Sequence, residues 1–312
     1  MLKRISLRKI GLTTIALLAI LLMYLFPKND NLKVKEKLEY TSLVNMNDIF
    51  LLDKNSYVSL TKVILSESQI ENKARELLTI LTVGSDSKVP SGFKAIIPPD
   101  TKILSLKYEN GLIKVDFSKE ILDVNKQNEE KMIEAIVYTL TSIDDVHKII
   151  IYVEGDILTK LPKTKKNLPS TLDRTYGINK EYDFTKTTSI NDITIYYVNK
   201  IEDVNYYIPV TKYLNDEREK ITIIIDQLAN NYNKNLMSYL NQNTKLVSNT
   251  INDKTMNLDF NEYLFDDFDK REVLEEVIYT IGLSVKDNYD IKDIVITVNN
   301  NKICKINSKN KC

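Results

Sequence analysis

Apolar and polar residues along this chain alternate with two different periods, and the order of these periods predicts the secondary structure. Residues 47–65 alternate on either side of the turn-forming cluster DKNS, which predicts a β-hairpin. The next segment, SESQIENKARELLTILT, opens with a serine-rich cap and then carries apolar residues at helical spacing. The residues of this apolar stripe are Ile70, Ala74, Leu77, Leu78 and Leu81.

A second set of elements follows a loop that contains proline and glycine. The stretch LKYENGLIKVDFSKEIL, residues 106–122, consists of two extended arms around Asn110-Gly111, a strong hairpin signal. EEKMIEAIVYTLTSI places its apolar residues on one helical face, and KIIIYVEG has the continuous apolar character of a buried strand. The predicted order is therefore β-β-α-β-β-α-β.

Four short sequence segments of this unit recur in the second half of the chain, in the same order. The pairs are NDIFLL (47–52) with NDITIYY (191–197), VDFSKEIL (115–122) with LDFNEYLF (258–265), EKMIEAIVYTL (130–140) with REVLEEVIYTI (271–281), and VHKIIIYVEG (146–155) with IKDIVITVNN (291–300). Their offsets all lie between 141 and 145 residues. We interpret this as a tandem duplication.

The second copy is predicted to have the same elements with more diverged loops. They are strands near 191–198 and 204–213, a helix near 216–231, a hairpin near 244–260 that turns at NDKT, a helix near 270–285 and a strand near 291–298. The predicted fold class is α+β, with two tandem domains that each have a small sheet and two helices.

The N-terminus carries a membrane signal. Two lysines and two arginines lie among residues 3–9, and an uncharged apolar run follows at residues 10–26. As a helix this run spans roughly 26 Å, close to the hydrocarbon thickness of a bilayer. A cleaved signal peptide is the alternative, but residues 23–26 are too large for a peptidase site, and no cysteine nearby indicates a lipoprotein. We predict an uncleaved single-pass anchor, with the N-terminus in the cytoplasm and the domains outside.

These signals divide the chain into six parts. They are the basic segment and transmembrane signal anchor (1–29), a linker (30–45), the first domain (46–158), a second linker (159–188), the diverged second domain (189–306) and a tail (307–312). The second linker is polar and contains prolines, as a connector should be. Its PKTKKN motif could touch anionic lipid or wall polymer, but a solvated linker is the simpler interpretation.

Composition and single residues give little indication of a chemical function. The 43 basic and 43 acidic residues balance, so no net field points to nucleic acid as a partner. His147 is the only histidine, which excludes a multi-histidine metal site. Cys304 and Cys312 match neither a zinc nor a CxxC pattern, and both a disulfide and two separate thiols remain open. No phosphate-binding loop or nucleophile motif is present, and we predict no cofactor.

The stretches IIPPDTKILSLKYENGLIKVDFSKEI and EAIVYTLTSIDDVHKIIIYVEG together resemble the GerMN domain family of sporulation and spore germination proteins. The resemblance covers nearly all of residues 45–300 and is weaker in the second copy, where Asn300 replaces the final glycine. The positions that fit the family pattern are Pro99, Thr101, Gly111, Asp116, Phe117, Thr139, Val146 and Gly155, with Asp259 and Phe260 in the second copy.

The resemblance implies assembly rather than catalysis. Such domains are similar in fold to ring-building domains of the channel between mother cell and forespore, so the expected partners are envelope or sporulation-complex proteins, and further copies of this chain. Family members are often lipoproteins, whereas this chain has a predicted transmembrane anchor. The alternative function is that of a general envelope protein that binds wall polymer or an envelope partner without a link to sporulation.

The repeated aspartate is the main candidate for chemistry. Alternation places Asp116 on the polar face of its strand, and Asp259 has the same phase. We expect each aspartate to cap the turn or short helix that follows it. A subunit contact is the second interpretation. Catalysis is the third, with Asp116 and Glu120 as the nearest carboxylate pair for a wall hydrolase.

Overall fold

The computed structural model describes residues 46–85, 88–231 and 233–307. The predicted anchor at residues 10–26, the linker at 30–45 and Cys312 lie outside these ranges. Inside them, no helix is both long enough and apolar enough to cross a membrane.

The first repeat contains the elements that its periodicity predicts. In chain order they are β1 (Met46–Leu52), β2 (Val58–Ile64), α2 (Ile70–Leu81), β3 (Ile103–Glu109), β4 (Leu112–Phe117), α3 (Glu129–Leu140) and β5 (Lys148–Val153). A 3₁₀ helix, η1 (Lys119–Asp123), and a short strand, β6 (Asp156–Ile157), are additional. The strands β3-β4-β5-β6 form one sheet, in which only β4 and β5 are parallel.

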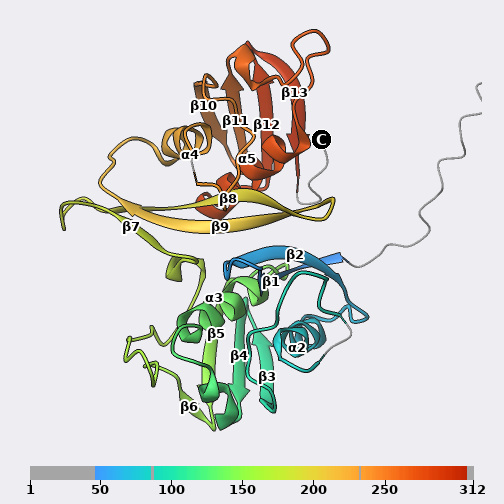
Figure 1. The fold of residues 1–312 in the computed structure, drawn as a ribbon, viewed down its shortest axis with the longest axis vertical. Helices are drawn as coiled ribbons and strands as arrows, with labels where there is room; N and C mark the ends of the chain where they lie inside the picture. Colours follow the sequence, from blue (N-terminus) through green and yellow to red (C-terminus); the bar gives the residue numbers. More distant parts are fainter. Residues whose placement is uncertain (1–45, 86–87, 232, 308–312) are drawn as a thin grey trace, which may run out of the picture. The chain divides into compact units, whose positions relative to one another are not determined.

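Helix α3 lies between the β1–β2 hairpin and the β3–β6 sheet (Figure 1). Residues around most of the helix are buried as a result. On its hairpin side, the Tyr138 ring packs edge-on against Phe50 of β1 at 5.3 Å between centroids. A helix that is covered on two sides needs apolar residues beyond a single stripe, which explains the near-continuous run MIEAIVYTL.

The second repeat has the same order of elements. They are β8 (Asn191–Ile201), β9 (Val204–Leu214), α4 (Lys220–Ala229), β10 (Leu246–Asn252), β11 (Thr255–Phe260), the 3₁₀ helix η3 (Glu262–Leu264), α5 (Glu275–Asn288), β12 (Asp293–Val298) and β13 (Asn301–Ile306). The sheet β10-β11-β12-β13 repeats the topology of the first. Strand β13 was not among the predicted elements, although residues 301–306 were placed in the second domain. Cys304 in this strand is disulfide-bonded.

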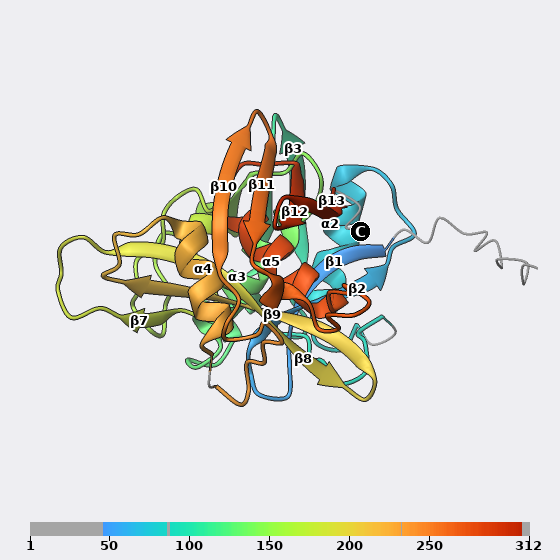
Figure 2. The same cartoon turned by 90° about the horizontal axis from the view of Figure 1, so that it is seen from above.

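The hairpins of the two repeats join into one sheet. Its strands lie in the order β1-β2-β9-β7, where β7 is Glu181–Asp183, and β8 also pairs with β9. The β8–β9 hairpin is paired along its whole length, as Figures 1 and 2 both show. In contrast, β2 meets β9 through a single residue pair, Leu60 with Tyr207. The junction between the repeats must therefore be held by side chains as well.

The sequence predicts residues 159–188 to be a linker, but most of this segment packs against the first repeat, and its β7 pairs with β9 of the second repeat. Leu161, Leu168, Leu172 and Ile178 are all buried in its core. Ile149 and Leu172 pair through both backbone N–H groups at 2.8 Å. The segment also contains the 3₁₀ helix η2 (Arg174–Tyr176). Its prolines and charges suggest a solvated connector, but its widely spaced apolar residues anchor it to the domain that precedes it.

Candidate functional site

The aspartate of the first repeat fixes a turn on the neighbouring strand. Asp116 is half-buried in β4, while Val115 and Phe117 beside it face the core, as predicted. Its Oδ1 accepts a hydrogen bond from the backbone N–H of Gly155 at 3.1 Å. Gly155 has φ of +88° in the tight turn between β5 and β6, a conformation that glycine adopts without strain.

This arrangement differs from the predicted cap of the following turn. Ser118 is the N-cap residue of η1, and its side chain makes no capping hydrogen bond there. Its Oγ instead accepts from Lys102 N at 2.9 Å. The reason is that β4 and β5 are parallel, so the ends of both strands meet at one edge and place the turn after β5 within reach of Asp116.

The second repeat contains the same contact in a more buried form. Asp259 is 7% exposed, and its Oδ1 accepts from Asn300 N at 2.8 Å and from the hydroxyl of Thr297. Asn300 stands where the first repeat has glycine and has φ of +63°. Asparagine tolerates this left-handed conformation better than most residues, so the diverged copy keeps the turn.

Opposite each aspartate, the edge strand contains a β-bulge. The register of β3 on β4 shifts between Ile103 and Ser105, and Ser105 then pairs with Asp116. The register of β10 on β11 shifts at the equivalent place, so that Ser248 pairs with Asp259. The extra residues in the two bulges are apolar and solvent-exposed: Leu104 is 49% exposed and Val247 is 62% exposed. Bulges re-aim side chains and recur at functional surfaces.

The remaining positions of the first repeat that fit the family pattern make packing or backbone contacts, or lie at the surface. A Cβ on Gly111, which has φ of +83°, would lie 2.9 Å from His147 Cδ2. The Thr139 hydroxyl accepts from Phe50 N at 3.0 Å and so attaches α3 to β1. Thr101 Oγ1 is buried without a hydrogen-bond partner among the described residues. Pro99 and His147 are both exposed at the surface.

The second repeat attaches its helix through a different residue. Phe260 is fully buried, like Phe117. Ser284 Oγ accepts from Tyr196 N at 2.9 Å, which gives α5 the contact with β8 that Thr139 gives α3 with β1. Thr280, the sequence equivalent of Thr139, bonds to its own helix at Val277 O. Sequence alignment of the repeats alone points to the wrong residue, because the contact has moved by one helical turn.

Substituting each aspartate by alanine is expected to affect the two repeats unequally. Asp259→Ala removes the acceptor of two part-buried hydrogen bonds, from Asn300 N and from the Thr297 hydroxyl, and should cost about 2 kcal/mol of unfolding free energy. Asp116→Ala removes one half-buried hydrogen bond and should cost about 1 kcal/mol. Urea unfolding of both variants measures the difference. Equal losses, or a larger loss at Asp116, would contradict this geometry.

An ion pair across the junction of the repeats was not predicted. Arg174 Nη1 lies 2.7 Å from Asp287 Oδ1 and also donates to the Tyr196 hydroxyl at 3.2 Å. The guanidinium lies over the Tyr138 ring at 4.8 Å. Burial lowers the pKa of Arg174, but the charge of Asp287 outweighs it and holds the pKa above its ordinary value. Asp287 itself is only 2% exposed, so the pair depends on the arginine.

Asn179 bridges the two hairpins where the strand ladder stops. Its Oδ1 accepts from Val58 N at 2.9 Å, and its Nδ2 donates to Val58 O at 2.8 Å and to Pro209 O at 2.7 Å. Pro209 has no N–H and cannot continue the pairing of β9 with β2. The side-chain amide replaces the missing ladder bonds and links both strands.

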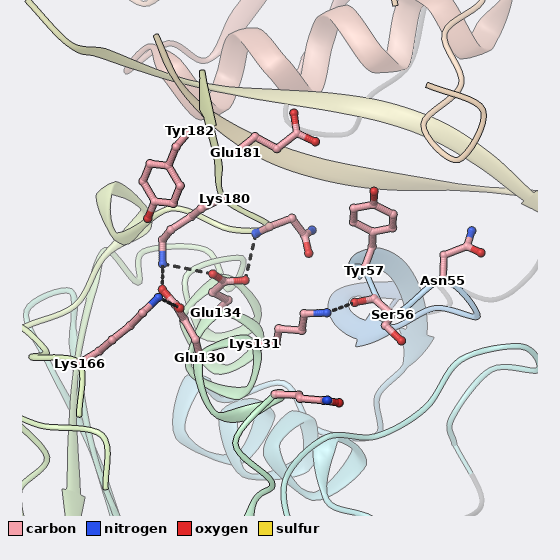
Figure 3. Close-up of a pocket in the computed structure, with 12 residues that line it drawn as sticks. Asn55, Ser56, Tyr57, Glu130, Lys131, Glu134, Lys166, Lys180, Glu181 and Tyr182 are labelled. Carbon is pink, nitrogen blue, oxygen red and sulfur yellow. Dashed lines mark hydrogen bonds and ion pairs between the residues drawn. The ribbon is translucent and has the colours of Figure 1, made fainter. Parts of the chain in front are cut away.

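Beside Asn179, charged side chains line a cleft in the first repeat (Figure 3). Lys180 Nζ donates to Glu130 Oε1 at 2.8 Å and to Glu134 Oε1 at 3.2 Å, and Lys166 pairs with the other oxygen of Glu130. Burial raises the pKa of Glu134, and the charge of Lys180 opposes that shift. Asn179 N also donates to Glu134 at 2.9 Å. No group of three histidine, cysteine, aspartate or glutamate side chains within the described ranges is placed to hold a metal ion.

Two copies of one α+β unit in tandem are the architecture of a tandem GerMN protein, to whose solved structure this chain is similar. The Germane family, described as "Sporulation and spore germination", matches residues 48–159 and 194–304. The chain belongs to this family, which confirms the resemblance found in its sequence.

The sequence of a Bacillus subtilis relative and a solved structure of its tandem domains extend the likeness over both repeats. The chain is 31% identical over 277 residues to the spore germination protein GerM of strain 168, covering 84% of this chain and 74% of that protein. The solved structure of the tandem GerMN domains of the sporulation protein GerM matches with a TM-score of 0.74 and 31% identity. That match covers 82% of this chain and 91% of the solved one. The predicted fold class of two tandem GerMN-like domains is thereby confirmed.

Proposed function

We propose that this protein acts in sporulation or spore germination by assembling with other proteins, and that it is not an enzyme. In this proposal, residues 10–26 anchor the chain in the cell membrane, and both repeats lie outside. The similarity to GerM across both repeats supports a role in sporulation or spore germination. The proposed partners are envelope or sporulation-complex proteins, and further copies of this chain.

The observation that carries the proposal is the pair of exposed bulge residues, Leu104 and Val247. Both lie on the first strand of their four-stranded sheets, and no other strand in the described ranges pairs with the outer edges of β3 and β10. An exposed apolar residue on an edge strand that pairs with no further strand favours association with another chain. The same feature occurs at equivalent places in both repeats, although their surrounding sequences have diverged.

The carboxylates argue against the hydrolase alternative. Asp116 is engaged with the Gly155 turn. A hydrogen bond from the Ser118 hydroxyl lowers the pKa of Glu120 below its ordinary value. A general acid for glycoside hydrolysis needs a raised pKa, so Glu120 has the wrong electrostatics for that role.

Photo-crosslinking in intact cells tests the proposal. A benzophenone amino acid placed at residue 104 or 247 is expected to form protein adducts several-fold more efficiently than the same group at residue 157. Ile157 is the matched control, because it is an exposed apolar residue on β6, at the opposite edge of the first sheet. Adducts that are absent at both bulges, or equally strong at residue 157, would contradict the proposal.

A further inference from the structure

The cleft beside α3 is separate from the bulge surfaces and has the size of a ligand site. Its volume is about 510 Å³, inside the range of about 300–1,000 Å³ that small-molecule sites occupy. The β1–β2 turn, the start of α3, Lys166 and residues 179–182 line it. Lys166 belongs to the PKTKKN motif, so the structure brings that basic segment to a concave surface.

One lysine of the cleft lining, Lys131, has no carboxylate partner among the described residues. Lys166 and Lys180 are paired with the two glutamates of α3. Glu181 lies 3.4 Å from Lys212. Lys131 donates at 2.6 Å to the carbonyl of Ser56, a neutral group, and this is its only hydrogen-bond acceptor among the described residues. An ammonium group has three donors, so Lys131 can also bind an anion in the cleft.

Aromatic rings stand on both sides of these charges. Tyr182 is 63% exposed, and one face of its ring is stacked on Tyr213 at 5.0 Å with an interplanar angle of 15°. Figure 3 shows the Tyr182 ring near Lys180 and the Tyr57 ring on the other side of the cleft. Side-chain amides of Asn55 and Gln127 complete the lining and can both donate and accept.

We propose that this cleft binds a short oligosaccharide that carries a carboxylate. The apolar face of a sugar ring packs on the exposed part of the Tyr182 ring, and sugar hydroxyl or acetamido groups bond to Asn55 and Gln127. The carboxylate binds Lys131. The polar lining disfavours an apolar ligand, and the three glutamates disfavour a polyanion such as nucleic acid.

Two disaccharides that differ mainly in one carboxylate test this proposal. The probes are N-acetylglucosamine–N-acetylmuramic acid and the neutral N,N′-diacetylchitobiose, titrated calorimetrically into the full-length chain in detergent. We expect the acidic probe to bind at least about threefold more tightly, as one partly exposed ion pair allows. Lys131→Gln should remove this preference, and Tyr182→Ala should weaken both probes at least about threefold.

Lys107→Gln is the matched control, because Lys107 is an exposed lysine on β3 outside the cleft, and this variant should bind like the wild type. Thermal unfolding of each variant confirms that the fold is retained. No binding of either probe at millimolar concentrations would overturn the proposal. Equal affinities of wild type for both probes, or unchanged binding in Lys131→Gln and Tyr182→Ala, would also overturn it. None of these outcomes affects crosslinking at residues 104 and 247, so the two proposals fail independently.

Discussion

Replacing Arg174 by methionine is expected to lower the unfolding free energy by about 3 kcal/mol, the largest loss of any single polar contact at the junction. The variant leaves the carboxylate of Asp287 buried, and within the described ranges only the Tyr196 hydroxyl then donates a hydrogen bond to it. It also removes the cation from the face of the Tyr138 ring. Urea unfolding at neutral pH measures the loss.

Two further variants isolate the cause of that loss. Arg218→Met breaks an exposed pair with Asp216 at 2.6 Å and should cost no more than about 1 kcal/mol. Arg174→Met combined with Asp287→Leu removes both charges and should recover most of the stability, because no buried charge is then left unpaired. A single and a double variant of equal stability would show that the stranded carboxylate is not the cause.

Lys180→Met is expected to cost about 2 kcal/mol at pH 7, and the deficit should shrink as the pH falls. The side chain of Glu134 is only 4% exposed, and Lys180 is its cationic partner. In the native protein burial already raises the pKa of Glu134 above its ordinary 4.5, and removal of Lys180 raises it further. A carboxyl group whose pKa is higher in the folded than in the unfolded state favours folding when it is protonated. Lowering the pH therefore reduces the stability deficit of Lys180→Met.

The control for this pH effect is Lys212→Met. Lys212 pairs with Glu181, a more exposed carboxylate, and has no deeply buried carboxylate partner in the described part of the chain. Its loss should cost less than about 1 kcal/mol and should change little between about pH 7 and pH 5. A Lys180→Met deficit that stays constant over the same interval would contradict the role assigned to Glu134.

Local periodicity was sufficient for most of the elements. The Asn110-Gly111 turn, the apolar stripe of α2 and the phase of Asp116 each depend on residues close together in sequence. The tandem duplication is also visible directly, because the repeated words keep nearly constant spacing. For this reason the hairpins, the helices and the order of both repeats were predicted from the sequence.

The contacts that join the repeats could not be predicted in the same way. Arg174 and Asp287 are 113 residues apart, and Asn179 is 121 residues from Val58. Nothing in the local pattern indicates which distant residue will complete such a pair. The bulges at Leu104 and Val247 were also missed, since one extra residue leaves the alternation of a short strand almost unchanged.

The most direct test of the assembly function is spore formation and germination in the source bacterium after deletion of this protein. We expect fewer spores or slower germination with normal vegetative growth, restored by the wild-type chain but not by the Leu104→Asp, Val247→Asp double variant at equal abundance. Unchanged spore counts and germination in the deletion strain would contradict a role in this process. Full rescue by the double variant would contradict assembly through the two bulges.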